Sequence, residues 1–308
     1  QPGSSFKPFI YSAALEKGFT PLTIVNDAPL FFDATETGSQ PWEPKNYDGK
    51  FEGAMPLKTA LAKSKNMVSI RILRSIGTAY AQDWITRFGF EPEKHPAYLT
   101  MALGAGSVTP MQMATAYGVF ANGGYRVPPM LIARLTDNKG KPLLEAHAPV
   151  LDDSLRTLEA RNAFVMTGLL QEVARAGTAA RAQATLKRPD IYGKTGTTND
   201  SMDAWFAGYN PALVGVVWIG YDNPRKLGDR ETGGGLALPV WIDLMQFALK
   251  NVPVGEPAPP EGVTAVNGSW VYEEYAGGGG VSSLGLEDKV PQAPSSEERN
   301  SILDLFRR

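Results

Sequence analysis

The chain has 308 residues, of which 43% are hydrophobic and 20% are charged, so it is long enough and apolar enough to bury a sizeable core. Its formal net charge is -2, with Lys and Arg scattered along the chain, which argues against nucleic acid as a partner. The absence of Cys excludes disulfides, thiolate nucleophiles and cysteine-based zinc sites. With His95 and His147 as the only histidines, we expect no Ser-His-Asp triad, no metal site and no cofactor. No run of 18 apolar residues occurs, so we expect no membrane span or signal peptide in this chain.

The first residues, Gln1 to Lys7, predict the start of a helix that carries a hydroxyl and an amine on one face. Ser4 and Lys7 lie three residues apart, which places them one turn apart. Pro8 lacks the N–H that would bond the Ser4 carbonyl, so we expect packing to hold this first turn. An apolar stripe predicts that the helix is buried, with Gly18 as its stop; the stripe consists of Phe6, Phe9, Ile10, Ala13 and Ala14. By itself, a Ser-x-x-Lys pair fits an N-cap serine and a solvated lysine equally well.

A loop region and two helices are predicted next. Residues 19–55 are rich in Pro, Gly, Asp and Asn with isolated aromatic residues, which indicates an ordered loop that roofs a cleft. Pro56 opens a helical pattern that halts at Ser64-Lys65-Asn66 and then resumes. The halt leaves three polar residues between two helices.

The remaining elements follow the same kind of periodicity. Helices are predicted over 79–88, 109–120, 158–173 and 238–249, and a small hairpin over 131–144. Residues 191–197, 204–209 and 213–221 predict consecutive antiparallel strands. From Val252 onward Pro, Gly, Ser and Glu dominate, so we predict one domain over residues 1–250 and a peripheral tail over 251–308.

The strand that contains Lys194-Thr195-Gly196-Thr197 predicts a peptide-binding edge. Alternation puts Lys194 and Gly196 on one face and Thr195 and Thr197 on the other, and Gly allows a substrate backbone to approach closely. An exposed strand edge accepts an extended peptide as an additional strand, while Lys and Thr side chains bind a terminal carboxylate. Taken alone, the segment also fits an exposed polar strand.

Together, three polar segments carry a family resemblance. Ser4-x-x-Lys7, Ser64-x-Asn66 and Lys194-Thr195-Gly196, in this order, resemble the signatures of penicillin-recognising serine acyltransferases. The strings Lys194 to Asp200 and Asp203 to Tyr209, with Gln1-Pro2-Gly3-Ser4, resemble the transpeptidase domain of bifunctional class A penicillin-binding proteins. Trp42 to Tyr47 and Ser64 to Ser69 resemble their Gram-negative 1A type. The resemblance covers roughly residues 1 to 250.

The resemblance implies an α+β fold, in which an antiparallel sheet is flanked by helices and accompanied by an all-helical subdomain. It also implies strands that precede the nucleophile helix, so we expect an upstream piece of the same protein to complete the sheet. A chain that starts three residues before its nucleophile is a further reason to expect a longer protein. Relatives carry a membrane anchor and a glycosyltransferase domain, and the implied location is the periplasmic face of the bacterial inner membrane.

The implied reaction is D,D-transpeptidation of peptidoglycan. Ser4 attacks the carbonyl of a D-alanyl-D-alanine stem peptide, forms an acyl-enzyme and expels D-alanine, and an amine of a neighbouring stem then takes the acyl group. β-Lactam antibiotics acylate the same serine. The implied catalytic residues are Ser4, Lys7, Ser64, Asn66 and Lys194, the substrate-binding residues are Thr195, Gly196 and Thr197, and the oxyanion hole consists of the backbone N–H groups of Ser4 and Thr197.

As the base, Lys7 must be neutral, so its pKa must fall from about 10.4 to near neutrality, at a cost of about 4 kcal/mol. A helix dipole contributes only about 1 kcal/mol, so we expect burial and a nearby cation, Lys194 or Lys65, to supply the difference. Whether Lys7 or Ser64 relays the proton at each step stays open.

Three other functions stay open for the same residues. A serine β-lactamase needs a base that activates water, and Glu159-Ala160-Arg161-Asn162 is the nearest string to the E-x-x-L-N signature and fails it; class D enzymes use a modified lysine instead. A D,D-carboxypeptidase uses the same residues with water as the acceptor. A non-catalytic sensor domain binds β-lactams covalently and signals. Asp203, Trp205 and Tyr209 we interpret as structural.

Overall fold

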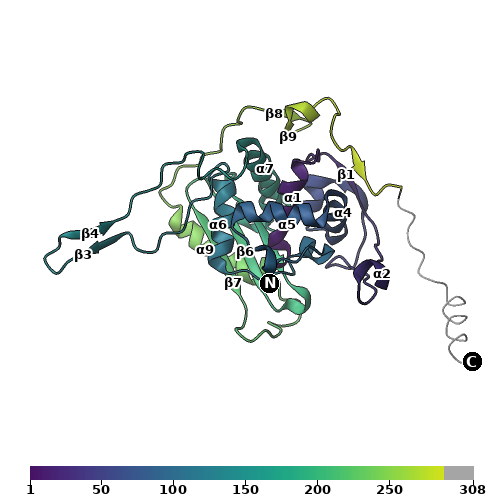
Figure 1. Cartoon of the computed structure of the whole chain (residues 1–308), viewed down its shortest axis with the longest axis horizontal. Coiled ribbons are helices and arrows are strands. Elements are labelled where there is room, and N and C mark those ends of the chain that lie inside the picture. Colours follow the sequence, from purple (N-terminus) through teal and green to yellow (C-terminus); the bar gives the residue numbers. More distant parts are fainter. Residues whose placement is uncertain (288–308) are drawn as a thin grey trace, which may run out of the picture.

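Helix α1 (Lys7–Leu15) runs through the middle of the molecule in the computed structural model, which describes residues 1–287 (Figure 1). All nine of its residues are buried, which goes beyond the predicted apolar stripe. It packs against α4 (Asn66–Ile76), α5 (Thr78–Ile85) and α7 (Ala160–Ala176). A helix that is buried on every side tolerates few unpaired polar groups, so any amine on it must find its hydrogen-bond partners inside the protein.

Three antiparallel strands form the central sheet, in the order β5 (Tyr192–Thr197), β6 (Ala204–Tyr209) and β7 (Val214–Ile219). The predicted strands are therefore confirmed to within about two residues at each end. Every residue of β6 is buried because helices cover both of its faces. On one face Phe206 packs edge-on against Trp241 of α9 (Leu238–Ala248), and on the other the Tyr209 hydroxyl bonds that of Thr167 in α7.

The remaining helices and the hairpin fill in around this sheet. Thr109 and Gln112 form a capping box at the start of α6: the Gln112 N–H donates to the Thr109 hydroxyl oxygen, and the Thr109 N–H donates to the Gln112 side-chain oxygen. The predicted hairpin projects from the body as a two-stranded arm (Figure 1). The α-helices and arm strands not yet given are α2 (Ala34–Thr37), α3 (Leu57–Ala62), α6 (Pro110–Ala121), α8 (Ala180–Leu186), β3 (Arg134–Thr136) and β4 (Pro142–Glu145). Across residues 1–287 there is no helix with the length and apolar character that a bilayer crossing requires.

The segment predicted as a loop roof contains two strands. β1 (Ile24–Asp27) pairs antiparallel with β2 (Gly53–Pro56), so the loop prediction was wrong at both ends of the segment. Four-residue strands with Asn, Asp and Gly in them give little alternation to detect. Between them, Phe32 and Trp42 stack with their centroids 5.4 Å apart, as the isolated aromatic residues indicated.

Part of the predicted C-terminal tail belongs to the fold. β8 (Val263–Val266) and β9 (Ser269–Tyr272) form a hairpin, and β10 (Ser283–Leu284) adds to β1 as a parallel strand. The hairpin turns at Asn267-Gly268, both with positive φ, and this dipeptide is a hairpin signal that the composition argument overlooked. The boundary at residue 250 stays a prediction, and residues 288–308 of the predicted tail lie outside the described residues.

Candidate active site

Ser4 lies on a 3-10 turn, η1 (Gly3–Phe6), which leads directly into α1. The Lys7 N–H donates to the Ser4 carbonyl, an i+3 bond that replaces the i+4 bond that Pro8 cannot make. In a 3-10 helix the side chains at i and i+3 eclipse, so Ser4 and Lys7 project in the same direction. The Ser4 side chain lines the main cavity of the molecule, and its hydroxyl has no hydrogen bond to any of residues 1–287.

Three glycines hold this turn against the sheet. Gly3 has a φ of +56°, and a Cβ there would lie 2.5 Å from the Thr197 carbonyl oxygen. A Cβ on Gly104 would lie 2.0 Å from the Gly3 carbonyl oxygen, and the Gly3 N–H donates to the Gly104 carbonyl at 3.2 Å. A Cβ on Gly196 would lie 2.3 Å from the Pro2 carbonyl oxygen. The face of Gly196 that would carry a side chain is thus filled by the Ser4 turn itself.

Ser64 lies in the predicted break between α3 and α4, with a φ of +58° that a serine rarely adopts. The break is held from outside, because the Asn46 side-chain oxygen accepts hydrogen bonds from the Asn66 N–H (2.8 Å) and the Met67 N–H (3.4 Å) at the start of α4. The Asn66 amide in turn donates to the Lys45 carbonyl at 2.8 Å. Segment 45–46 of the roof therefore fixes Asn66, at both its backbone and its side chain, and the first turn of α4.

Two lysine amines meet at this break. Lys7 Nζ donates to the Asn66 Oδ1 (2.7 Å), the Ser64 carbonyl (2.8 Å) and the Ser64 hydroxyl (3.3 Å). Lys194 Nζ, which comes from β5, donates to the same hydroxyl at 2.9 Å and to the Thr195 carbonyl at 3.1 Å. The structure thus brings together Lys7, Ser64, Asn66 and Lys194 from three distant parts of the chain, and Ser64 Oγ lies between the two amines.

Burial changes the protonation of both amines. The Lys7 side chain is fully buried, which holds its pKa well below the usual value; the nearby Lys194 lowers it further and Asp27 partly opposes the shift. Burial lowers the pKa of Lys194 to about 7. The two causes predicted for Lys7, burial and a cation at Lys194, are therefore the two largest.

Lys65 does not contribute to that shift. Its Nζ turns away and pairs with the carboxylates of Glu52 (2.8 Å), Asp48 (3.3 Å) and Asp27 (3.5 Å). The alternative that Lys65 is the second cation at Lys7 is thus wrong, because three carboxylates draw this amine toward the roof.

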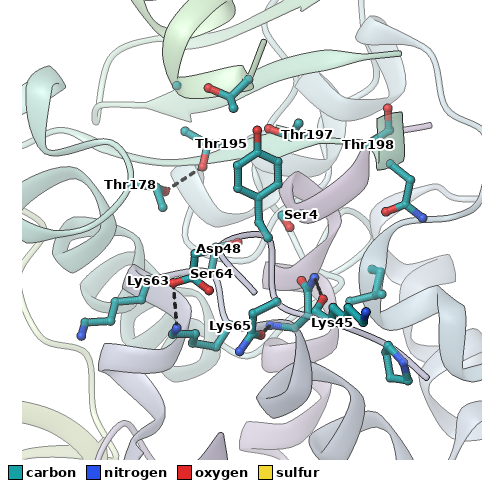
Figure 2. A pocket seen from close by; sticks show the side chains of 18 of the residues that line it. Ser4, Lys45, Asp48, Lys63, Ser64, Lys65, Thr178, Thr195, Thr197 and Thr198 are labelled. Atoms are coloured by element: carbon teal, nitrogen blue, oxygen red, sulfur yellow. Dashed lines mark hydrogen bonds and ion pairs between the residues drawn. The ribbon is translucent and has the colours of Figure 1, made fainter. Parts of the chain in front are cut away.

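The cavity beside this cluster has a volume of about 970 Å³, and Figure 2 shows Thr195, Thr197 and Thr198 along one side with Ser64 and Lys65 on the other. The Thr197 hydroxyl accepts from the Gly233 N–H at 3.0 Å, which leaves its own proton for a ligand. Two of the lining residues that were not predicted as site residues, Thr178 and Arg181, bring further polar groups to the cavity. The Thr178 and Thr195 hydroxyls are 2.7 Å apart, and Arg181 has no ion pair within residues 1–287. No periodicity in the sequence marks either residue as part of the site.

Asp203 and Trp205, which we interpreted as structural, hydrogen-bond to neighbouring parts of the fold. The Trp205 indole donates to the Gln1 carbonyl at 2.7 Å, and Asp203 accepts from the Trp218 indole at 2.9 Å. The Trp205 bond ties β6 to the segment that precedes Ser4, and the Asp203 bond ties the start of β6 to β7.

A family model described as the penicillin binding protein transpeptidase domain matches residues 1–246. The chain belongs to this family. The family consists of serine acyltransferases of cell-wall synthesis that are antibiotic targets, so this penicillin-binding transpeptidase chain is of the enzyme class that the three motifs indicated.

Named relatives agree on the 1A type. The transpeptidase chain is 50% identical over 275 residues to penicillin-binding protein 1A of Neisseria gonorrhoeae, which covers 89% of this chain and 34% of that protein. It is 44% identical over 312 residues to penicillin-binding protein 1A of Pseudomonas aeruginosa, with 86% and 38% covered. The chain therefore spans about a third of the length of these curated relatives.

A solved structure gives the same answer for the fold. The crystal structure of penicillin-binding protein 1A from Haemophilus influenzae superposes with a TM-score of 0.83 at 33% identity, over 89% of this chain and 48% of that one. The expected α+β fold and the resemblance to the 1A type are confirmed.

Proposed function

We propose that the chain is a peptidoglycan D,D-transpeptidase that cross-links stem peptides through an acyl-enzyme on Ser4. The observation that carries the proposal is the buried Lys7–Ser64–Lys194 cluster beside a cavity lined by Ser4. Two amines with lowered pKa values, joined by one hydroxyl, are an arrangement that activates a nucleophile rather than one that stabilises a fold.

In the acylation step the Ser4 oxygen bonds to the carbonyl carbon of the penultimate D-alanine, and its proton passes to a neutral Lys7. A neutral amine has two N–H groups and one lone pair. The two short donations, to Asn66 Oδ1 and to the Ser64 carbonyl, use both N–H groups and leave the lone pair for a hydroxyl proton.

The proton then has to reach the nitrogen of the departing D-alanine. The Ser64 hydroxyl accepts from Lys194 and lies 3.3 Å from Lys7 Nζ, so it is placed to pass a proton onward as the C–N bond breaks. The second half of the reaction reverses these transfers, with the acceptor amine in the place of D-alanine.

The site offers groups for two parts of the donor peptide, its terminal carboxylate and the oxygen of its reacting carbonyl. Thr195, Thr197 and Thr178 hydroxyls with Arg181 offer donors and a positive charge to the terminal carboxylate. The Ser4 and Thr197 backbone N–H groups form the proposed oxyanion hole, each worth about 3 kcal/mol, and the close packing of Gly3 on the Thr197 backbone keeps the two segments in contact.

The β-lactamase alternative finds no support at the position that the sequence offered. Glu159 precedes α7 and lines a different cavity, together with Glu16, Trp84 and Arg87. Asn162 is buried against Ser12, where its amide donates to the Ser12 carbonyl at 3.0 Å. Neither residue lines the cavity of Ser4.

Mass spectrometry of the full chain after incubation with benzylpenicillin tests the acyl-enzyme. We expect one covalent adduct per chain on the peptide that contains Ser4, and none in the Ser4→Ala variant. An unmodified native chain, or an adduct that persists in Ser4→Ala, overturns the proposal.

The acceptor is tested separately with a donor peptide that ends in D-Ala-D-Ala and a range of D-amino acid concentrations. A transpeptidase gives exchange product that rises with amine concentration while hydrolysis falls. Hydrolysis that is unaffected by amine identifies a D,D-carboxypeptidase, and rapid loss of the penicillin adduct identifies a β-lactamase. An adduct with no turnover of any donor identifies a sensor.

We further propose that a segment of the same protein outside this chain pairs with β7. Within residues 1–287 β7 has β6 as its only strand partner. Next to it α9 exposes an apolar stripe at i, i+4 and i+7, namely Val240, Leu244 and Phe247, of which Phe247 is 83% exposed. Amide hydrogen exchange on β7, with and without the additional sequence that the relatives carry, tests this: alternating β7 amides should become protected, and unchanged exchange overturns it.

We also propose the periplasmic face of the inner membrane as the location, by analogy with the 1A relatives. A penicillin probe that does not cross the inner membrane should label Ser4 in spheroplasts. Labelling only after lysis overturns this location.

A further inference from the structure

His95 is a buried histidine that the proposed mechanism does not use. The residue is 1% exposed, and its Nδ1 atom is buried with no hydrogen-bond partner among residues 1–287. Buried polar atoms in folded proteins almost always have a partner, so an unpaired one needs an explanation. Burial lowers the pKa of His95 to about 4, and no charged side chain within residues 1–287 contributes to that shift. The ring is therefore neutral in the folded protein at neutral pH.

The His95 ring lies against the turn that carries Ser4. It stacks on Phe6 of η1, with the ring centroids 4.7 Å apart and the planes 13° apart, and Phe6 is two residues from Ser4. The ring also packs against Gly106, where a Cβ would lie 2.1 Å from His95 Nδ1. Gly106 comes two residues after the carbonyl that accepts the Gly3 N–H at 3.2 Å. The imidazole thus packs against both of the segments whose mutual hydrogen bond places Ser4.

Hydrogen bonds fix the backbone of His95 from a third side. The Gln82 side chain, on α5, donates to the His95 and Pro92 carbonyls, both at 3.0 Å. The His95 N–H donates to the Pro92 carbonyl, also at 3.0 Å. With the backbone held in this way, a change in the ring has to be accommodated by the Ser4 turn.

Protonation of the ring is incompatible with this packing. An imidazolium carries a proton on both ring nitrogens, so Nδ1 would be a buried donor without an acceptor. The attraction of a cation for the Phe6 ring is weak compared with the loss of hydration. The charged residues on the elements around the ring are exposed or, for Lys7, directed at Ser64 and Asn66; they are Lys7 on α1, Asp83 on α5, Glu91 beside Phe90, and Glu93 and Lys94 on η3 (Pro92–Lys94). Within residues 1–287 no carboxylate pairs with the ring, so nothing offsets its charge.

We propose that His95 is a positioning residue for Ser4: the neutral ring holds η1 in place, and protonation of the ring releases the turn and slows acylation. The proposal rests on the proposed transpeptidase function, because it takes Ser4 as the nucleophile. It gives the site a second acid-sensitive group besides Lys7. An opened turn exposes the imidazole to water and binds the proton more tightly than the closed turn, so the open form gains as pH falls from about 6.5 toward about 4.

The acid limb of the acylation profile, measured with a chromogenic cephalosporin, tests this. Protonation of Lys7 alone gives a slope of about one in the logarithm of the rate constant against pH, because one proton is bound. A second proton on His95 makes the limb steeper. Between about pH 6 and 4 we expect the native rate constant to fall about tenfold more than that of His95→Phe or His95→Gln. Phe keeps an aromatic ring beside Phe6 and Gln keeps a neutral polar group, and neither titrates.

His147→Gln is the matched control. His147 is the other histidine of the chain and is exposed on the loop after β4, so its replacement should leave the steep native limb unchanged. The same variant assigns the imidazole signals in proton NMR, because the chain has only two histidines. We expect the His95 signal to titrate below the pH of about 6.5 of an ordinary histidine, over the range in which the limb steepens.

Two further measurements distinguish a released turn from an unfolded protein. The end-point yield should stay at one adduct per chain across the acid limb, because an open turn that closes again still reacts. A return to neutral pH should restore the native rate.

Parallel acid limbs in the native chain and both His95 variants overturn the assignment. The native chain also decides the case by itself, because a slope of about one throughout the range in which the His95 signal titrates overturns it whether or not the variants fold. Failure of the proposed function has a different signature, because the cephalosporin then leaves Ser4 unmodified at every pH.

Discussion

The Ser64-Lys65-Asn66 break separates two lysine environments that burial alone would not distinguish. On one side Lys7 and Lys194 are fully buried and meet only hydroxyl, carbonyl and amide oxygens. On the other side Lys65 is 3% exposed and faces three carboxylates. Burial lowers the pKa of the first two, whereas for Lys65 the carboxylates outweigh burial and raise it.

This difference teaches what separates a candidate base from a structural cation in this protein. A buried amine with neutral partners has a charged form that is poorly stabilised, so it can give up and take back a proton near neutral pH. A buried amine with carboxylates stays charged and holds segments together, here β1, the roof and the start of α4. A buried lysine given neutral partners in place of carboxylates should therefore become able to release its proton, and one given carboxylates in place of neutral partners should stay charged.

The largest expected effect is on the catalytic side. Lys7→Met should lower the second-order rate constant of acylation by about 10³-fold, because it removes the base. The free energy of unfolding should change by less than about 1.5 kcal/mol, since the side chains are similar in volume and the Ser64 and Asn66 groups left behind line a cavity that water can reach. Stopped-flow acylation with a chromogenic cephalosporin and denaturant unfolding measure the two. A rate within tenfold of native would remove Lys7 from the mechanism.

The matching substitution at Lys65 should lower the free energy of unfolding. Lys65→Met leaves the buried Asp27 without its cation, and we expect a loss of about 3 kcal/mol in the free energy of unfolding. The double variant Lys65→Met/Asp27→Asn should recover part of that loss, which a simple packing defect would not do. Equal stability of native and Lys65→Met would mean that the comparison of the two environments is mistaken.

Gly196→Ala probes the contact between the sheet and the Ser4 turn. Its added Cβ meets the Pro2 carbonyl and the Ser5 hydroxyl, so we expect a destabilisation of about 1 to 3 kcal/mol together with slower acylation. Gly277→Ala is the matched control, because a Cβ there meets nothing within 4 Å and its φ is not in the left-handed region. Thermal unfolding and acylation rates of the two variants should diverge, and similar values would contradict the close packing.

The smallest expected effect is a change in pH dependence. Below its own pKa of about 7, Lys194 carries a charge that lowers the pKa of Lys7, so Lys194→Met should raise the pKa of Lys7. Acylation needs a neutral Lys7 and fails as pH falls through that pKa, so the acid limb of the profile should move to higher pH. Lys65→Met is the control and should leave the limb in place. Profiles normalised to their own maxima separate this shift from any overall loss of rate.

Much of the site could be predicted from sequence because its motifs are local. The i+3 spacing of Ser4 and Lys7, the polar break at Ser64 and the period of the Lys194 strand are all set within a few residues. Thr178 and Arg181 could not be found in this way. Their role depends on where the end of α7 and the start of α8 lie in space, and no periodicity records that.

The sequence by itself determined most of the helices, the three central strands and the identities of the reactive groups, because side-chain period and residue chemistry are properties of short segments. Only the tertiary structure decided which lysine is the candidate base and which is a structural cation. Lys7 and Lys65 have the same side chain and similar burial, and they differ in whether segments 13 or more residues away bring carboxylates or neutral oxygens to the amine. Electrostatic energy depends on distance in space, so that choice belongs to the fold.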